Sequence, residues 1–275
     1  MKLKKIFRFD NKRQIWRILP TDTGKLIIEE REPGKKQVFF SCLELDSGKK
    51  IFKDFQPENN FWIGIETVKY DIIFFHKFAK PDMPKHKGIF AFDIRSKNFI
   101  WENPELTFLF IFKEKIFAYK EKFEGRNFFS IDHLTGEIVE ELGNDHEKIN
   151  QLRSESLLEE KVNGCLFPEI YEPETQLNLS ANNIFNSLRN NFVISGKIEF
   201  ILKDELLLMG FHTVNSKGSF DNLVRAVDLS RGKYILEETI SKETSLYLSD
   251  SFFVKDNFLL LLFGKTRLEV YKIIF

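Results

Sequence analysis

Cysteine is scarce in this chain, with only Cys42 and Cys165 among its 275 residues. The two lie too far apart in the sequence to form a C-x-x-C metal or redox motif. Isolated cysteines of this kind are more typical of buried thiols than of a disulfide, and they favour a reducing compartment.

Long apolar segments are also absent. The longest apolar run, Phe258–Phe263, is far too short to cross a bilayer. The basic residues at the start of the chain are not followed by the apolar stretch that a signal peptide requires. We therefore expect a soluble, cytoplasmic protein.

Neither sign of charge dominates, because 41 basic residues balance 41 acidic ones. A chain with no net charge lacks the long-range field that attracts nucleic acids or anionic membranes, so neither is expected as a partner. The sequence also lacks G-x-x-x-x-G-K-S/T, H-E-x-x-H and G-x-S-x-G, the signatures of phosphate-binding loops, zinc proteases and serine hydrolases. We expect no cofactor and no metal, and we assign no catalytic residue.

Phenylalanine, in contrast, is abundant. The chain has 31 phenylalanines, and 43% of its residues are apolar while 30% are charged. This balance is typical of a globular protein rather than a disordered one. Aromatic side chains favour strands and bury large areas, so the composition indicates an all-β fold.

Two patterns recur along the chain with a period of about 45 residues. The first is an apolar strand, a lysine with a polar pair, and a second apolar strand, and it occurs at residues 65–75, 109–118, 199–209 and 252–261. The second is a strand ending in Asp, a short turn and another strand, and it occurs at residues 45–52, 91–101, 131–139 and 226–236. Together they predict units of four antiparallel strands, the size of a propeller blade.

The second pattern resembles the tryptophan-docking repeat of quinoprotein-type β-propellers, best at Ala91–Trp101. The offset is kept with a different bulky residue at Phe52 and Leu236, and Glu140 breaks it. The resemblance implies that these bulky residues pack between neighbouring blades. The chain is also similar to an uncharacterised domain-of-unknown-function family of bacterial propeller-like proteins, partly through residues 165–171 and 195–209; this likeness implies no activity.

We predict a single β-propeller domain over residues 1–275 with about six blades; five or seven blades are the alternatives. The proposed units are residues 14–56, 61–104, 107–142, an irregular unit with short helices at 143–195, residues 196–240, and a last unit from residue 247. Residues 180–188 read as a helix with Ser180 as its N-cap. The last unit has only three strands, and Lys4–Phe9 would supply the fourth and close the ring.

Short turns should gather at one end of the sheets and loops of variable length at the other. Functional residues tend to lie on variable loops, so the candidate ligand-binding residues are His76, Lys85, His86, Arg126 and His212. The histidine spacing does not call for a metal site. The acidic run of Glu29, Glu30 and Glu32 reads as a solvated strand face.

Function is not determined by these observations. The favoured hypothesis is a monomeric, non-catalytic scaffold that binds a protein partner or small ligand through its variable-loop face. The alternative is a hydrolase or lyase acting on a sugar or another small molecule through carboxylates and histidines at the central channel.

Overall fold

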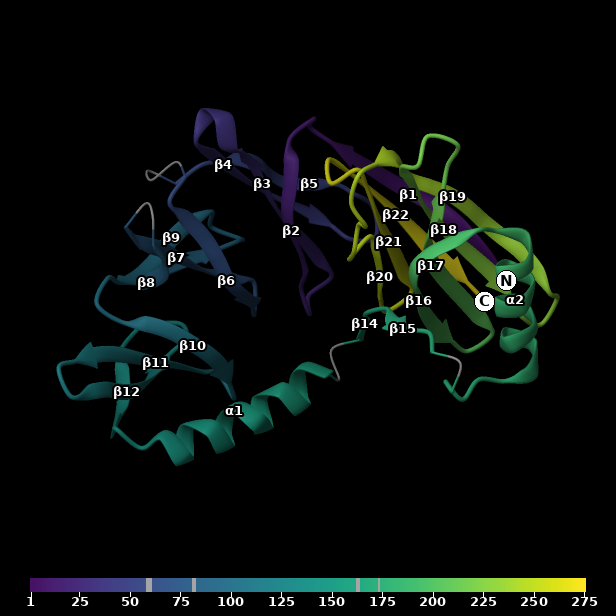
Figure 1. Ribbon diagram of the computed structural model, residues 1–275. Helices are drawn as coiled ribbons and strands as arrows, with labels where there is room; N and C mark the ends of the chain where they lie inside the picture. Colours follow the sequence, from purple (N-terminus) through teal and green to yellow (C-terminus); the bar gives the residue numbers. More distant parts are fainter. Residues whose placement is uncertain (58–60, 81–82, 162–163, 173) are drawn as a thin grey trace. The chain divides into compact units, whose positions relative to one another are not determined.

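The computed structural model describes residues 1–57, 61–80, 83–161, 164–172 and 174–275 (Figure 1). These residues form five small antiparallel sheets, two α-helices and one short 3-10 helix, η1 (Pro33–Lys35). They divide into two compact units. Unit 1 comprises residues 1–13, 46–48 and 164–275, and unit 2 comprises residues 14–45 and 49–163.

Unit 2 is built from three sheets of four strands, in which every strand pairs with its neighbours in the sequence. The strands are β2 (Gln14–Pro20), β3 (Lys25–Glu32), β4 (Gln37–Glu44) and β5 (Lys50–Phe55); β6 (Ile63–Lys69), β7 (Ile72–Lys80), β8 (Met83–Asp93) and β9 (Asn98–Asn103); and β10 (Thr107–Phe112), β11 (Lys115–Lys122), β12 (Gly125–Asp132) and β13 (Ile138–Gly143). They coincide with the units predicted at 14–56, 61–104 and 107–142.

Unit 1 holds the other two sheets. One has the order β15 (Glu169–Ile170), β16 (Ile194–Lys203), β17 (Leu206–Val214), β18 (Phe220–Asp228) and β19 (Lys233–Thr244). The other has the order β1 (Lys2–Asp10), β22 (Arg267–Ile274), β21 (Phe258–Phe263), β20 (Phe252–Lys255) and β14 (Cys165–Leu166). The expected pairing of the first strand with the last is present, since β1 runs antiparallel to β22.

The segment 143–195 does not form the sixth sheet that a count of six blades requires. It holds α1 (His146–Lys161) and α2 (Leu179–Asn191), and its two short strands, β14 and β15, add to the edges of the sheets in unit 1. Strands of two residues bury too little apolar surface to form a sheet of their own. Neither helix, within the described residues, has the length and apolar character needed to span a membrane.

Helix α2 confirms the helix expected at 180–188 but begins earlier. Its N-cap is Asn178, whose side-chain oxygen accepts a hydrogen bond from the amide of Ala181 at 2.8 Å. Ser180, the expected N-cap, lies inside the first turn. The helix buries Phe185 and Leu188 in a cluster with residues of β16 and β17. Packing on this sheet, rather than helix propensity alone, therefore holds α2 in place.

In unit 2, bulky residues on the last strand of a sheet pack against the following sheet. Trp101 of β9 lies over Gly136 in the β12–β13 turn, and its indole N–H donates to the carbonyl oxygen of His133 at 3.0 Å. Gly136 has a φ of +73°, and a Cβ atom there would lie 2.6 Å from the Trp101 ring, so only glycine leaves room. Phe52 packs edge-on against Phe92 with ring centroids 5.8 Å apart. The resemblance to quinoprotein-type repeats implies packing of this kind. That the chain contains such repeats stays a prediction.

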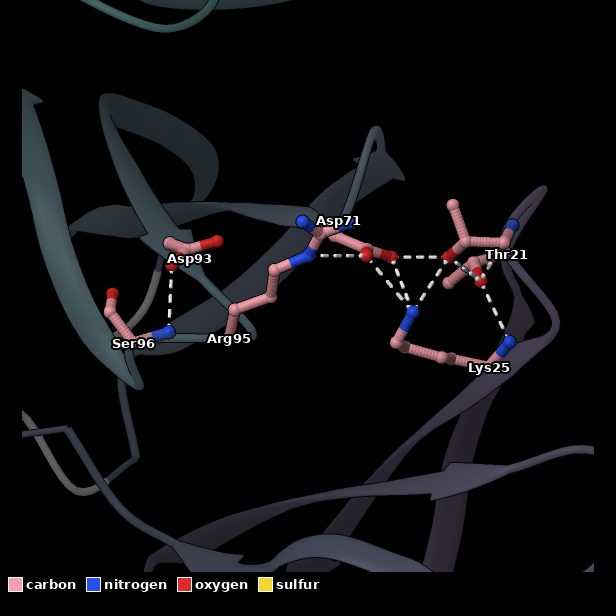
Figure 2. Close-up of polar contacts among 7 residues, drawn as sticks. Thr21, Lys25, Asp71, Asp93, Arg95 and Ser96 are labelled. Carbon is pink, nitrogen blue, oxygen red and sulfur yellow. Dashed lines mark hydrogen bonds and ion pairs between the residues drawn. The ribbon is translucent and has the colours of Figure 1, made fainter.

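Short turns of unit 2 meet around Asp71 (Figure 2). Tyr70 and Asp71 have φ values of 52° and 62°, as in the type I′ turn of a tight hairpin. Both Asp71 carboxylate oxygens lie 2.9 Å from Lys25 Nζ, one lies 3.3 Å from Arg95 Nε, and the Thr23 hydroxyl donates to the other. These partners belong to the β2–β3 and β8–β9 turns, so three hairpins are joined at one end. We call this group the turn cluster.

Replacing Trp101 with Ala is expected to destabilise the protein by about 2 to 4 kcal/mol, because ring packing and a hydrogen bond are both lost. Trp101→Phe keeps an aromatic ring over Gly136 and loses only the indole hydrogen bond, so it should cost about 0.5 to 1.5 kcal/mol. Urea unfolding followed by far-UV circular dichroism measures both changes. Equal losses for the two variants would contradict the proposed packing role.

The turn cluster predicts a pH-dependent contribution to stability. Burial would raise the pKa of Asp71, but hydrogen bonds from Thr23 and Lys25 outweigh it and hold this pKa below its usual value. A depressed pKa in the folded state means that the stabilisation is present above the unfolded pKa of about 3.9 and is lost as pH falls through the folded value. Asp71→Asn should therefore cost about 1 to 3 kcal/mol at neutral pH and progressively less below about pH 4.

Asp204→Asn is the matched control for this experiment. Asp204 also has a positive φ, 51°, in a short hairpin turn, but its side chain is exposed. Its substitution should change stability by less than about 0.5 kcal/mol at any pH. Urea denaturation at several pH values tests both variants, and a loss for Asp71→Asn that does not vary with pH would be inconsistent with the ionic role of Asp71.

Candidate functional site

The candidate site lies on the second sheet of unit 2, where β6, β7 and β8 bring together Glu66, His76 and His86. Glu66 is the extra residue of a β-bulge, because Ile65 pairs with Phe75 while Thr67 pairs with Phe74. A bulge redirects a side chain and is frequent beside functional sites. We call Glu66, His76 and His86 the histidine cluster.

Strand register explains why the two histidines meet. His86 pairs with Phe78 across β7 and β8, and His76 lies two residues before Phe78 and so projects from the same face. The two imidazole rings stack with centroids 3.5 Å apart and an interplanar angle of 10°. Each ring also contacts the edge or face of the Phe78 ring. A second irregularity falls at His76 itself, because Phe75 pairs with Phe90 while Lys77 pairs with Lys87, so two residues of β8 lie opposite His76.

One carboxylate oxygen of Glu66 serves both rings. Glu66 Oε1 lies 2.7 Å from His86 Nδ1 and 3.0 Å from His76 Nδ1. His86 is one-third exposed, with 34% of its side chain accessible, whereas only 1% of the His76 side chain is accessible. The contact at His76 does not have hydrogen-bond geometry, and neither ring nitrogen of His76 has a hydrogen-bond partner among the described residues. A buried polar group without a partner costs about 1 to 3 kcal/mol.

The electrostatics of the histidine cluster bear on the protonation of Glu66 and His76. Burial would raise the pKa of Glu66, but its close contacts with the two imidazole rings outweigh burial and lower it. Burial lowers the pKa of His76, and the contact with Glu66 offsets this only in part. Glu66 is therefore ionised and His76 is neutral near pH 7.

A buried ion pair stands beside this cluster. Arg31 of β3 lies 2.7 Å from Glu29, and its guanidinium donates to the carbonyl oxygens of Phe61, at 3.2 Å, and Ile63, at 2.8 Å. A Cβ atom at Gly64 would lie 3.0 Å from His76 Nε2 and 3.5 Å from Arg31 Nη2, so both side chains border the same glycine. Arg31 thus joins the first sheet of unit 2 to β6 and brings a positive charge to the His76 side of the site.

The expectation for the acidic run of β3 is wrong for two of its three residues. Glu29 and Glu30 are 1% and 0% exposed, and only Glu32 at the strand end is partly accessible. Strand β3 is an inner strand that is buried on both faces from Leu26 to Arg31. A run of charged residues in the sequence therefore does not indicate a solvent-exposed strand when other parts of the protein cover both faces of that strand.

The other predicted ligand residues have separate positions. Lys85 forms an ion pair with Glu121, and Glu121 pairs across the strands with Arg126, whose guanidinium lies 4.3 Å from the centroid of the Tyr119 ring. His76 and His86 thus lie together, whereas Lys85 and Arg126 both flank Glu121. His212 lies in unit 1, where its Nε2 accepts a hydrogen bond from the Leu248 amide at 3.0 Å.

Sequence reasoning missed Glu66 and Arg31. Glu66 follows no recognisable motif, and its orientation depends on a bulge that propensity does not reveal. The alternation of strand β7 could have placed His76 and Phe78 on one face, but the pairing of Phe78 with His86 requires the register of the hairpin. The histidine cluster provides two nitrogen ligands and one oxygen ligand, all within 4.8 Å of one another, a set that could hold a metal ion.

A cavity of about 380 Å³ in unit 1 is the second candidate. Tyr171, Arg189, Phe192 and Lys197 contribute to its walls. Tyr171 stacks on the buried Phe185 with centroids 3.9 Å apart, and Arg189 lies 5.2 Å from the Tyr171 centroid. Tyr171 and Arg189 therefore already have a structural role, which is to pack α2 against its sheet. For this reason the histidine cluster is the stronger candidate for a functional site.

One family model matches part of the chain and assigns no function. Residues 19–101 match a family described as "Domain of unknown function (DUF4905)". The match contains Glu66, His76 and His86 and excludes the segments 165–171 and 195–209, on which part of the expected family likeness rests. No curated protein matches the chain.

Solved structures show only a remote likeness. TolB from Acinetobacter baumannii is 11% identical, with 91% of this chain and 64% of that chain covered and a TM-score of 0.30. A structure described as Kluyveromyces lactis Hsv2 complete loop 6CD is 14% identical, with coverages of 96% and 74% and a TM-score of 0.30. The chain thus spans less than two thirds of the TolB chain.

Proposed function

We propose that the five sheets are the blades of one β-propeller over residues 1–275. Each is a small antiparallel sheet with too little surface to bury both faces alone. Support comes from the packing of Trp101 and Phe52 onto the following sheet, which is how blades share apolar surface. The pairing of β1 with β22 also joins the two ends of the sequence in one sheet, as a ring requires.

Small-angle X-ray scattering tests this arrangement. A compact domain of 275 residues has an expected radius of gyration of about 19 Å. We expect this value for the propeller, together with the scattering mass of one chain, because we propose a monomer. A radius of gyration several ångströms larger at monomeric mass would indicate two separate units and would refute the ring.

We propose that this propeller is a non-catalytic scaffold that binds a protein partner or small ligand at the histidine cluster and its neighbours Lys85 and Arg126. The observation that carries the proposal is the difference between two groups of polar residues. In the turn cluster, Asp71 is bonded to Thr23, Lys25 and Arg95. In the histidine cluster, His76 keeps both ring nitrogens without a hydrogen bond from the described residues.

Catalysis is the weaker proposal for the same residues. A hydrolase or lyase needs a general acid or base whose pKa lies near the working pH and which reaches the substrate. Glu66 and His86 form an acid–imidazole pair, but the pKa of Glu66 is lowered by both histidines, and His76 is buried. An ionised carboxylate with a low pKa is a weak base and a poor acid at neutral pH, which favours binding over proton transfer.

We also propose a reducing, cytoplasmic location. Cys42 and Cys165 are both free thiols, and burial raises the pKa of Cys42 to about 12. A buried thiol of this kind is inert and acts as a small apolar side chain.

Charge reversal tests the proposed binding face. Lys85→Glu with Arg126→Glu should abolish capture of a stoichiometric partner by the tagged protein from a lysate of its source cells, because the approach to the histidine cluster becomes acidic. The matched control is Lys97→Glu with Lys113→Glu, which changes the charge equally at two exposed turn positions. Quantitative mass spectrometry compares both with wild type. A partner that is retained by the first variant, or lost equally from both, would contradict this face.

A further inference from the structure

The histidine cluster has the ligand types of a metal centre. Imidazole nitrogen with carboxylate oxygen suits zinc and neighbouring first-row divalent ions. Glu66, His76 and His86 come from three adjacent strands, β6, β7 and β8, so backbone hydrogen bonds fix their spacing. We propose that these three side chains bind one divalent transition-metal ion, with Zn²⁺ as the ion that fits the ligand set best.

Distances within the cluster are close to those that a zinc ion requires. Zinc–nitrogen and zinc–oxygen bonds of about 2.0–2.2 Å place tetrahedral ligand atoms about 3.3 Å apart. Glu66 Oε1 lies 3.0 Å from His76 Nδ1 and 2.7 Å from His86 Nδ1. Each of these two nitrogens needs to move away from the Glu66 oxygen by a few tenths of an ångström to admit the ion.

The stacked rings must also tilt apart. A metal ion lies in the plane of each imidazole that binds it, and two rings at 10° to each other cannot both meet this condition. His86 is the ring that can turn, because one third of its side chain is exposed, whereas His76 is held between strands. Metal binding therefore requires a rotation of one partly exposed side chain and no change in strand register.

The unsatisfied state of His76 supports a missing ligand. Only 1% of this side chain is exposed, and neither of its ring nitrogens has a hydrogen bond within the described chain. Most buried polar side chains in proteins are bonded, so an orphaned imidazole beside a second imidazole and a carboxylate needs an explanation. A metal ion bound at Nδ1 would give His76 the partner that it lacks.

Surrounding charges bear on the affinity of the cluster for a cation. Arg31 borders Gly64 together with His76 and so brings a positive charge near the cluster. Arg31 is itself paired with Glu29 at 2.7 Å, so its repulsion of a dication is reduced. Three protein ligands leave a fourth position for water or for an atom of a bound partner.

This inference concerns the same histidine cluster as the proposed partner binding, so the experiment must distinguish the failure of one from the failure of the other. The test uses the full chain, freed of any histidine tag and treated with a chelator. Isothermal titration with Zn²⁺ should show one site per chain, and Co²⁺ should produce the visible absorption of a tetrahedral complex with nitrogen and oxygen ligands. His86→Ala and Glu66→Gln should each weaken Zn²⁺ binding at least tenfold.

Two controls separate this site from surface binding and from misfolding. His146→Ala removes an exposed histidine of α1, and it should leave Zn²⁺ affinity unchanged. Far-UV circular dichroism and thermal melts of the metal-free proteins verify folding, and the partly exposed His86 gives the decisive variant if Glu66→Gln does not fold. The inference is overturned if wild type takes up no stoichiometric Zn²⁺, or if folded His86→Ala binds it as well as wild type.

The same measurement on Lys85→Glu with Arg126→Glu distinguishes the two proposals. This variant leaves the three ligands intact, so its Zn²⁺ stoichiometry should equal that of wild type even where partner capture is lost. A failure of zinc binding with intact partner capture overturns the metal site alone.

Discussion

The structure depends on one constraint, which is that a sheet of four short strands cannot bury both of its faces by itself. Strand β3 illustrates the result, because its residues from Leu26 to Arg31 are all buried, on both faces. Such a strand needs cover from each side, and a neighbouring sheet can supply it. Trp101 meets this need for the second sheet of unit 2 by lying over Gly136 of the third. Phenylalanine suits the same requirement, since aromatic side chains bury large areas.

Close packing of sheets requires most polar groups between them to find a partner. Arg31 does so by pairing with Glu29 and donating to the carbonyl oxygens of Phe61 and Ile63. These bonds connect the first sheet of unit 2 to the second. Asp71 does so with Lys25 and Arg95. Removing one member of such a group leaves a buried charge, which costs more than the group contributes. His76 stands out against these examples because it is equally buried and has no hydrogen-bonding partner in the described chain.

The sequence allows the strands to be predicted better than the site. Repeats with a 45-residue period locate the first three sheets because each hairpin carries its own apolar strands and turn residues. The segment 143–195 breaks the period, and its two-residue strands β14 and β15 depend on sheets formed by distant residues. Glu29 and Glu30 are expected to be solvated because they are charged, but both are buried. The charge of a residue does not reveal whether other parts of the protein cover its strand. Glu66 could not be foreseen for another reason: its direction follows from a bulge, a property of register rather than of residue type.

The position of the histidine cluster bears on how a chain of small, similar sheets could gain a function. Variable loops were the expected place for binding residues, and Lys85 and Arg126 do lie near strand ends. The three residues with metal-binding chemistry, however, lie within β6, β7 and β8. Strands hold side chains more exactly than loops do, and a metal site requires that accuracy because its bond lengths vary little. A single bulge at Glu66 is then sufficient to turn an ordinary strand face into a set of converging ligands, with the fold of the sheet unchanged.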